Sequence, residues 1–259
     1  MTNPLAALIM SGMILISSRD NPHIKAALKD TSETFLLEGF RLCADALASG
    51  YAPEKLFLTA QARERYPTAP LEQAAAQVFE ITQPVAQKLG DTQNPQGAFG
   101  VFLRQNGKAQ DFWKPSGNYI ALEKIQDPGN LGGIARTAQA LGLDGLLVCG
   151  GCDVYHPKAL RASMGALLRL PVTQVDNLPA ALRECALPCY AAVPDRDATP
   201  VFQCDFAQGA VIVIGNEAHG LSEEALNACK HKITIPMPGS AESLNAAVAA
   251  AILMWELRH

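Results

Sequence analysis

Apolar positions in the second half of the chain form short runs that are separated by stretches with helical spacing. Short aliphatic runs are typical of strands buried on both faces of a sheet. Their alternation with helices predicts a mostly parallel α/β sheet with helices on both faces. The expected strands are 119–122, 145–149, 171–175, 189–193, 210–214 and 232–235, and the expected helices are 130–141, 157–167, 178–185, 222–229 and 242–257.

Residues 21–100 show the same alternation in smaller pieces. The clearest are a helix over residues 38–48 and apolar strands at 56–58, 78–81 and 99–103. Residues 104–117 are polar and rich in turn formers, with no sustained period, which is typical of a linker between domains. The pattern therefore predicts a small α/β domain over residues 14–103, a linker over 104–117 and a second domain over 118–259.

The amino-terminal residues 1–13 include a short apolar run that no Lys or Arg precedes. The run is too short to span a bilayer and lacks the basic start of a signal peptide. We expect a disordered or non-native leader, with either Met1 or Met13 as the natural start. The apolar run at 246–255 is also too short for a span, so we expect a buried helix and no membrane partner.

Composition and charge narrow the class of protein. Of 259 residues, 49% are apolar and 18% are charged, as in ordinary globular proteins. Lys and Arg number 21 against 25 Asp and Glu, so bulk charge gives no sign of nucleic-acid binding, and a polyanion must be met by a local basic patch. Seven scattered cysteines argue against a disulfide framework and favour a reducing cytoplasm.

Cys149 and Cys152, with His156 nearby, have a metal-like spacing. No second pair of ligands follows at the spacing of a zinc finger, and Cys149 ends an expected strand. We therefore expect a Gly-rich turn out of the sheet and no metal site.

The first chemically unusual loop covers residues 123–136. Pro128 and Gly129 form a turn, Asn130 can cap the following helix, and two further glycines allow close approach of a backbone. An anion could sit at such a helix N-terminus, and Arg136 matches a phosphate bidentately. The alternative is a capped helix packed through its glycines, with Arg136 on the surface.

Two later loops also combine glycines or prolines with polar groups. In residues 214–221, a carboxylate at the tip of a buried strand is costly unless it pairs or orients something, which makes Glu217 a site candidate. His219 in the same loop is more typical of a solvated spectator. In residues 233–245, prolines prevent regular structure, and Ser243 and Asn245 stand where small polar groups cap a helix or bind a ligand.

These three segments resemble, in order and spacing, the three motifs of the SpoU (TrmH-like) RNA ribose methyltransferases of the SPOUT superfamily. The matching residues are Asn130 with Arg136, then Gly215, Asn216, Glu217, Gly220 and Leu221, then Ile235, Pro236, Met237, Ser243, Leu244 and Asn245. The match covers about residues 118–258. Residues 36–41 and 94–97 resemble, more loosely, a ribosomal-protein-like substrate-binding domain. Ala218 and the pair Ala246 and Ala247 depart from the family's pattern.

The resemblance implies methylation of a ribose 2′-hydroxyl in structured RNA, with S-adenosyl-L-methionine as cofactor. Ribosomal RNA is favoured over transfer RNA because of the extra domain, and a deep trefoil knot and a homodimer are implied. A tRNA methyltransferase and an inactive RNA-binding relative stay open as alternatives. A nucleotide-dependent enzyme on a doubly wound sheet would show a G-x-G-x-x-G or P-loop motif, and neither is present.

The same resemblance assigns roles to individual residues. The implied catalytic residues are Arg136, Asn130, Glu217, Ser243 and Asn245; the cofactor-binding residues are Gly215, Asn216, Gly220, Leu221, Ile235, Met237 and Leu244; and the RNA-binding candidates are Arg19, Lys25, Arg41, Asn94 and Gln96. A guanidinium with a pKa above about 12 is a poor base. We therefore expect Arg136 to clamp an RNA phosphate and stabilise the developing alkoxide, with water or the phosphate taking the proton.

Overall fold

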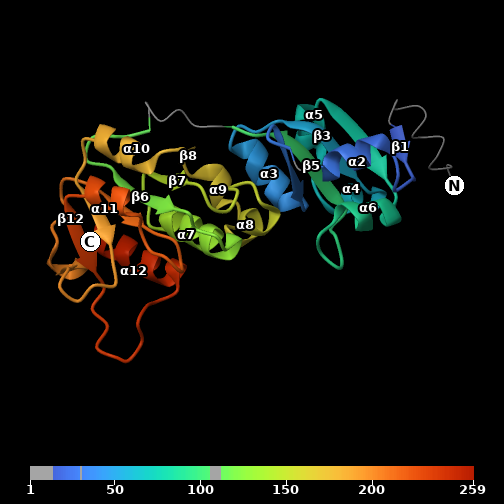
Figure 1. Ribbon diagram of the computed structural model, residues 1–259. Helices are drawn as coiled ribbons and strands as arrows, with labels where there is room; N and C mark the ends of the chain where they lie inside the picture. The colour runs from blue at the N-terminus through green and yellow to red at the C-terminus, as the bar shows by residue number, and fades with distance from the viewer. Residues whose placement is uncertain (1–13, 30, 106–111) are drawn as a thin grey trace. The chain divides into compact units, whose positions relative to one another are not determined.

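The computed structural model describes residues 14–29, 31–105 and 112–259 (Figure 1). The predicted leader and the middle of the predicted linker lie outside these residues. The chain divides into two compact units, one before residue 106 and one after it. Each unit has its own sheet and its own buried core, so each is described separately.

The first unit is built on a five-stranded mixed sheet with the order β1-β4-β3-β5-β2. Strands β1, β4 and β3 are parallel, and β5 runs antiparallel to β3 and β2. The strands are β1 (Ile14–Ile16), β2 (Thr34–Glu38), β3 (Pro53–Leu58), β4 (Gln77–Ile81) and β5 (Ala98–Leu103). The helices are α2 (Pro22–Leu28), α3 (Phe40–Ala48), α4 (Ala60–Arg65), α5 (Ala69–Ala74) and α6 (Gln83–Leu89).

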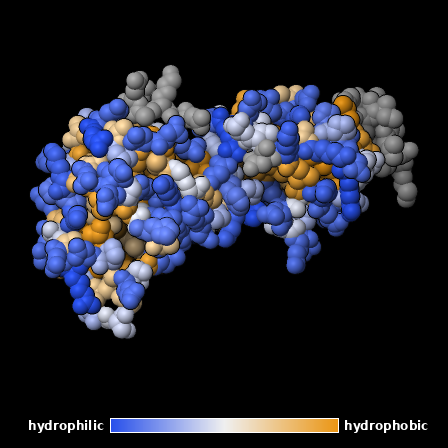
Figure 2. All heavy atoms as spheres, viewed as in Figure 1, coloured by the Kyte–Doolittle hydropathy of each residue, from blue (hydrophilic) through white to orange (hydrophobic). Residues whose placement is uncertain are grey.

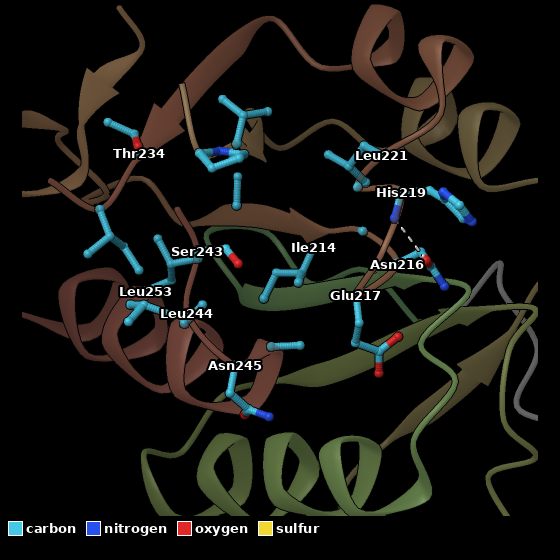
Figure 3. A pocket seen from close by; sticks show the side chains of 18 of the residues that line it. Ile214, Asn216, Glu217, His219, Leu221, Thr234, Ser243, Leu244, Asn245 and Leu253 are labelled. Atoms are coloured by element: carbon cyan, nitrogen blue, oxygen red, sulfur yellow. Dashed lines mark hydrogen bonds between the residues drawn. The ribbon is translucent and has the colours of Figure 1, made fainter. Parts of the chain in front are cut away.

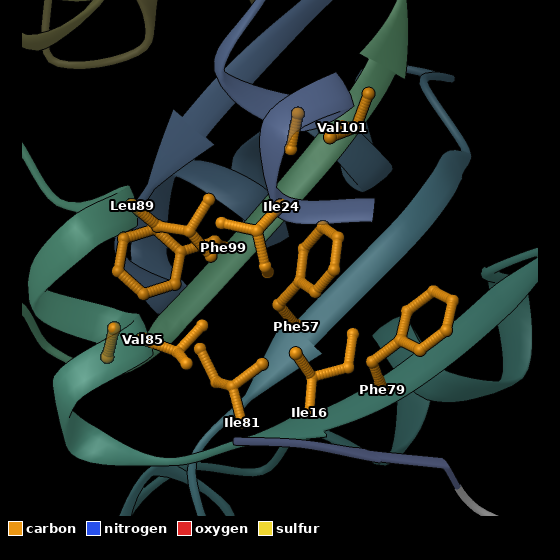
Figure 4. Packing of buried hydrophobic residues seen from close by; sticks show 11 residues of the cluster. Ile16, Ile24, Phe57, Phe79, Ile81, Val85, Leu89, Phe99 and Val101 are labelled. Carbon is orange, nitrogen blue, oxygen red and sulfur yellow. The ribbon is translucent and has the colours of Figure 1, made fainter. Parts of the chain in front are cut away.

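Alternation along β5 separates two faces of this sheet. Phe99 and Val101 join a buried cluster that includes Ile24 of α2 and Val85 of α6 (Figure 4). The intervening Gly100 faces α3, because a Cβ there would lie 3.4 Å from the Sγ of Cys43. Helices α2 and α6 therefore cover one face of the sheet and α3 covers the other.

The second unit contains a seven-stranded sheet with the order β10-β12-β9-β11-β6-β7-β8. All six strand pairings are parallel, which confirms the predicted sheet type. The strands are β6 (Asn118–Glu123), β7 (Gly145–Cys149), β8 (Val172–Gln174), β9 (Cys189–Ala192), β10 (Thr199–Pro200), β11 (Ala210–Ile214) and β12 (His231–Thr234). Strands β6, β7 and β11 are buried along their whole length, as expected for the centre of a parallel sheet.

Helices cover both faces of this sheet, as predicted. Leu178 and Leu182 of α10 and Ala225 of α11 pack in one cluster against the sheet. Helices α7 and α12 pack against each other and against β6, β7 and β11. The helical segments are α7 (Pro128–Ala140), α8 (Pro157–Ala162), α9 (Ala166–Arg169), α10 (Leu178–Glu184), η2 (Val201–Gln203), α11 (Glu223–Ala228) and α12 (Ala246–Arg258).

Two of the expected helices of the second unit differ substantially from the structure. The helix predicted over 157–167 is broken into α8 and α9, because Met164 and Gly165 take left-handed backbone angles, with φ of 50° and 79°. The helix predicted from residue 242 begins only at Ala246, because the side chain of Asn245 caps its first turn. Both differences arise from backbone conformations that apolar periodicity does not report.

Two adjacent glycines of α7 give a test of how closely its surroundings pack. A Cβ on Gly132 would lie 2.6 Å from the carbonyl oxygen of Ala159 and from the Cβ of Ala162, whereas one on Gly133 would lie 3.5 Å from the Cβ of Ala247. We expect Gly132→Ala to lower the free energy of unfolding by about 1–3 kcal/mol through overpacking.

Gly133→Ala should raise that free energy by up to about 1 kcal/mol, since alanine favours the helix. Urea unfolding of both variants measures the difference. Equal effects of the two substitutions would contradict the close contact between α7 and α8.

Candidate active site

The three chemically unusual loops meet at one pocket of about 880 Å³ in the second unit (Figure 3). The parallel order β12-β9-β11-β6 brings the carboxyl ends of these strands to one edge of the sheet. The loops after β11, β12 and β6 therefore start side by side. Apolar side chains reach the surface of the second unit near the loop that precedes α12 (Figure 2). The pocket is lined by residues 192–194, 214–221, 233–235 and 242–246, together with Asn130, Leu226, Met237, Ala249 and Leu253.

Glu217 lies at the centre of the contacts between these loops. Its Oε2 accepts a hydrogen bond from the backbone N–H of Gln126 at 3.0 Å, and its Oε1 accepts from the backbone N–H of Asp127 at 3.2 Å. Oε1 also accepts from the Nδ2 of Asn130 at 3.0 Å. One carboxylate of the β11 loop thus binds three donors from the segment between β6 and α7.

The chain of hydrogen bonds continues into α12. Because ionised Glu217 can only accept, the amide of Asn130 turns its Nδ2 toward it and leaves its Oδ1 for the Nδ2 of Asn245, at 3.0 Å. The Oδ1 of Asn245 then accepts from the backbone N–H groups of Ala247 and Val248 at 2.9 and 3.2 Å. In Figure 3, Glu217 and Asn245 both point toward α7. The orientation of both amides therefore follows from the charge on Glu217.

The environment of Glu217 favours its charged form. Partial burial acts to raise its pKa, but the hydrogen bonds from Asn130, Gln126 and Asp127 outweigh this, and the pKa lies below its ordinary value. Glu217 is exposed, although the strand that precedes its loop is buried. Its carboxylate thus stays ionised and acts as a structural acceptor for the loop before α7.

Two expectations for the start of α7 are wrong. Asp127, not Asn130, caps the helix: its Oδ1 accepts from the N–H groups of Gly129 and Asn130 at 2.5 and 3.0 Å, and Pro128 supplies the first turn. Asn130 lies inside the helix, which frees its amide for Glu217. The anion at this N-terminus is the carboxylate of Asp127 itself, which already binds the N–H groups of Gly129 and Asn130.

The loop after β11 is held in a tight conformation by its own polar groups. The Nδ2 of Asn216 donates to the carbonyl of Lys124 at 2.8 Å, and its Oδ1 accepts from the N–H groups of Ala218 and His219. A Cβ on Gly215 would lie 2.2 Å from the carbonyl carbon of Gly220, so a larger residue cannot stand there. Ala218 has no positive φ, so its departure from the family's pattern causes no backbone strain.

The structure places the predicted site residues in two groups. All seven cofactor-binding candidates line the pocket, and so do Asn130, Glu217, Ser243 and Asn245. Arg136 does not line it. Its side chain is on the exposed side of α7 and makes no hydrogen bond or ion pair with another residue that the structure describes.

Sequence reasoning missed some contributors to this site. Asp127 could have been found, because Asp followed by Pro is a helix-start signal. The residues 192–194, which line the pocket at the end of β9, could not have been found, since only the strand order places β9 between β12 and β11. Buried Glu123, which accepts from the N–H and hydroxyl of Ser222 at 2.8 and 2.7 Å, had no local signal.

The RNA-binding candidates of the first unit lie on two faces. Lys25 on α2 pairs with Asp20 at 3.1 Å, and Arg19 donates through its Nε to the carbonyl of Pro84. Arg41 is exposed at the start of α3, on the opposite face, and Gln96 lies beside Gly39 there. Asn94 is exposed in the same turn as Gln96. Arg41 and Gln96 thus both lie near the start of α3, on the face of the sheet opposite Lys25.

The turn over residues 91–97 is fixed by Glu38. The Oε2 of Glu38 accepts from the N–H of Asp91 at 2.8 Å, and its Oε1 accepts from the hydroxyl of Thr92. A Cβ on Gly97 would meet the Oγ1 of Thr59 at 2.3 Å, so the end of this turn also packs closely. The turn is therefore a defined surface feature of the first unit.

Neither a metal cluster nor a membrane helix appears in the described part of the chain. Cys149 ends β7, and Gly150 and Gly151 then turn the chain with φ of 61° and 80°. No group of three or more His, Cys, Asp or Glu among the described residues could hold a metal ion. Within these same ranges, every helix is too short or too polar to cross a bilayer.

Comparison with known proteins identifies both units. Residues 117–255 match the SpoU rRNA Methylase family, and residues 16–100 match the MRM3-like substrate binding domain. An uncharacterized tRNA/rRNA methyltransferase of Synechocystis is 32% identical over 96% of this chain and 95% of its own. The 23S rRNA (guanosine(2553)-2′-O)-methyltransferase RlmP of Bacillus subtilis is 30% identical over 88% of this chain and 89% of its own.

A solved structure is similar over nearly the whole length. The AdoMet-bound rRNA methyltransferase of Sinorhizobium meliloti superposes with a TM-score of 0.84 and is 28% identical, covering 95% of this chain and 97% of that one.

The charge on Glu217 predicts a pH-dependent contribution to stability. Because folding lowers the pKa of Glu217, its stabilisation is present above the unfolded pKa and is lost as the pH falls through the folded one. We expect Glu217→Gln to lower the melting temperature most near neutral pH and progressively less below about pH 4.

Thermal melts of the wild type and the variant from neutral to acid pH measure this difference. Glu242→Gln, at an exposed position in the same pocket, is the control and should melt like the wild type. A deficit of Glu217→Gln that stays constant across the pH range would contradict the role of the charge.

Proposed function

The chain belongs to the SpoU rRNA methylase family, and we propose that it methylates a ribose 2′-hydroxyl of ribosomal RNA with S-adenosylmethionine as cofactor. The observation that carries this proposal is the pocket at which the three motif segments meet through Glu217, Asn130 and Asn245. The similarity to RlmP of Bacillus subtilis, over most of both chains, supports ribosomal RNA as the substrate.

The pocket fits the chemistry of this cofactor. Its volume of about 880 Å³ is within the range of small-molecule sites. Ile214, Leu221 and Leu244 supply apolar walls for an adenosine, and residues 235–244 form neither helix nor strand, which leaves backbone groups available for the base edge. No Lys or Arg occurs among the described residues that line it, so no cation opposes a sulfonium.

Arg136 supplies a positive charge for the negatively charged RNA. Bound S-adenosylmethionine provides an electrophilic methyl group, and the ribose 2′-oxygen must lose its proton as it attacks. In this proposal, the guanidinium of Arg136 grips a phosphate of the RNA and stabilises negative charge on that oxygen, rather than accepting a proton. The proton passes to water or to the phosphate.

The remaining motif residues position the reacting groups. Asn130, Glu217 and Asn245 hold the loops in register, and Ser243, exposed at the pocket, orients the ribose and the methionyl end of the cofactor. The trefoil knot that the family resemblance implies stays a prediction.

We assign RNA binding to the first unit and methyl transfer to the second. Residues 14–103 bind the RNA through Arg19, Lys25, Arg41, Asn94 and Gln96, residues 104–117 connect the units, and residues 118–259 carry the reaction. The match of residues 16–100 to the MRM3-like substrate binding domain supports this division. Seven cysteines without a disulfide are consistent with the cytoplasm as the site of action.

An apolar stripe on α12 supports a homodimer. Val248, Ile252 and Trp255 follow one another at helical spacing and are 50, 36 and 53% exposed. Exposed apolar side chains gathered on one helix face mark an interaction surface. A second copy of this chain would cover the stripe.

Methyl transfer to ribosomal RNA tests the proposed function. RNA from cells that lack the gene, incubated with labelled S-adenosylmethionine and the enzyme, should gain a 2′-O-methyl group in the ribosomal fraction. Arg136→Lys should retain measurable activity, because it keeps the charge, whereas Arg136→Ala should lose on the order of a hundredfold.

Cofactor binding provides the control for these variants. Both should bind S-adenosylmethionine like the wild type, since Arg136 does not line the pocket. Methylation of transfer RNA alone, or cofactor binding without turnover of any RNA, would contradict the proposed function. Equal inactivity of the two variants would contradict the role given to Arg136.

The dimer has its own test. Ile252→Arg should shift the sedimenting mass from two chains to one, because a buried unpaired charge is costly in an apolar interface. Leu103→Arg, at an apolar position that is 50% exposed in the first unit, should leave the mass unchanged. A wild-type protein that sediments as one chain at all concentrations would refute the dimer.

A further inference from the structure

Two aromatic rings of the first unit are stacked at the start of α3. Phe40 is the first residue of α3, and Tyr66 directly follows α4. Their ring centroids lie 5.0 Å apart and the ring planes differ by 7°. On the same tyrosine, the guanidinium carbon of Arg65 lies 5.4 Å from the ring centroid. Phe40, Tyr66 and Arg65 thus form a ladder of planar groups, which we name the stacking platform.

The platform is accessible from solvent. Phe40 and Tyr66 are half-buried, and Arg65 and the nearby Arg41 are exposed. The Tyr66 hydroxyl makes no hydrogen bond with any residue that the structure describes. Part of each ring surface is therefore open to a ligand.

The cations beside the platform are not neutralised. Within the described ranges, neither Arg41 nor Arg65 pairs with a carboxylate. By contrast, Arg63, two residues before Arg65, pairs with Glu72 at 3.3 Å and with Glu80 at 3.0 Å. Arg63 therefore serves the fold, while Arg65 and Arg41 are available to an external anion.

The platform adjoins the turn over residues 91–97. Gly39 immediately precedes Phe40, and a Cβ on Gly39 would lie 3.3 Å from the Oε1 of Gln96. Glu38 fixes the start of that turn through Asp91 and Thr92. Near the start of α3 there are therefore two stacked aromatic rings, the arginines Arg41 and Arg65, and the exposed amide of Gln96.

We propose that Tyr66, backed by the stacked ring of Phe40, binds an unpaired nucleobase of the substrate RNA, with Arg65 and Arg41 on neighbouring phosphates. The proposal rests on the proposed function, because it takes RNA as the substrate. Aromatic and guanidinium planes stack on unpaired bases, whereas bases within an RNA duplex are not accessible to them. Arg65 leaves the ring of Tyr66 to the base and contacts a phosphate beside it. The first unit then selects a loop, bulge or other single-stranded element.

Steady-state methylation of ribosomal RNA from cells that lack the gene tests the platform in the full chain. Tyr66→Leu should raise the KM for RNA about tenfold, since base stacking on an aromatic ring is lost. The kcat and the affinity for S-adenosylmethionine should not change, because Tyr66 is far in sequence from the pocket-lining residues and belongs to the other unit. Tyr66→Phe retains the ring and should behave like the wild type.

A binding measurement separates this inference from the proposed function. Fluorescence anisotropy with a short uridine oligonucleotide and with an RNA duplex of equal length should show that the wild type prefers the single strand. Tyr66→Leu should lose that preference, and Tyr66→Phe should keep it. If the wild type methylates ribosomal RNA but Tyr66→Leu has an unchanged KM and preference, the platform is refuted and the function stands. If the preference depends on Tyr66 but no RNA is methylated, the function fails and the platform stands.

A surface variant covers the case in which Tyr66→Leu does not fold. Arg65→Gln changes an exposed side chain and should raise the KM for RNA several-fold, with a weaker dependence of binding on salt. Arg63→Gln, which breaks an internal ion pair, should instead lower the melting temperature. An unchanged KM and salt dependence in Arg65→Gln would also overturn the proposal.

Discussion

The hydrogen bonds that end on the carboxylate of Glu217 are the interaction on which the site depends. Three donors from the segment before and within α7 converge on it, and Asn130 passes the contact on to Asn245 at the start of α12. No disulfide joins the three loops to one another, since all seven cysteines are free. The ionised carboxylate of Glu217 therefore links the loop after β11 to the segment before α7, and its lowered pKa is the electrostatic consequence of the donors that it binds.

This arrangement separates cofactor binding from the grip on RNA. The described residues that line the pocket include no Lys or Arg, while Arg136 projects from the exposed side of the neighbouring helix. A pocket without cations suits a positively charged sulfonium, and an exposed guanidinium suits a phosphate. In the proposed function, Arg136 and the arginines at the start of α3 supply the positive charge that meets the RNA, although the chain as a whole is acidic.

Much of the fold follows from the sequence, and the limits have physical causes. The buried strands were predictable because a parallel sheet needs continuous apolar runs, as in residues 210–214. The spatial order of the strands was not predictable, so the contribution of residues 192–194 to the pocket could not be foreseen. The helix break at Met164 depends on a left-handed backbone that periodicity does not encode. Asn130 is among the predicted catalytic residues, but its contact with Glu217 could not be foreseen, because Glu217 lies in another loop.

A crystal structure of the protein with S-adenosylmethionine bound tests the role of Glu217 most directly. We expect the cofactor between the loop at 215–221 and the segment 235–245, with the Nδ2 of Asn130 still donating to Glu217 and Asn245 still capping α12. Cofactor density elsewhere on the second unit, or a bound state in which Glu217 has left Asn130, would contradict this expectation.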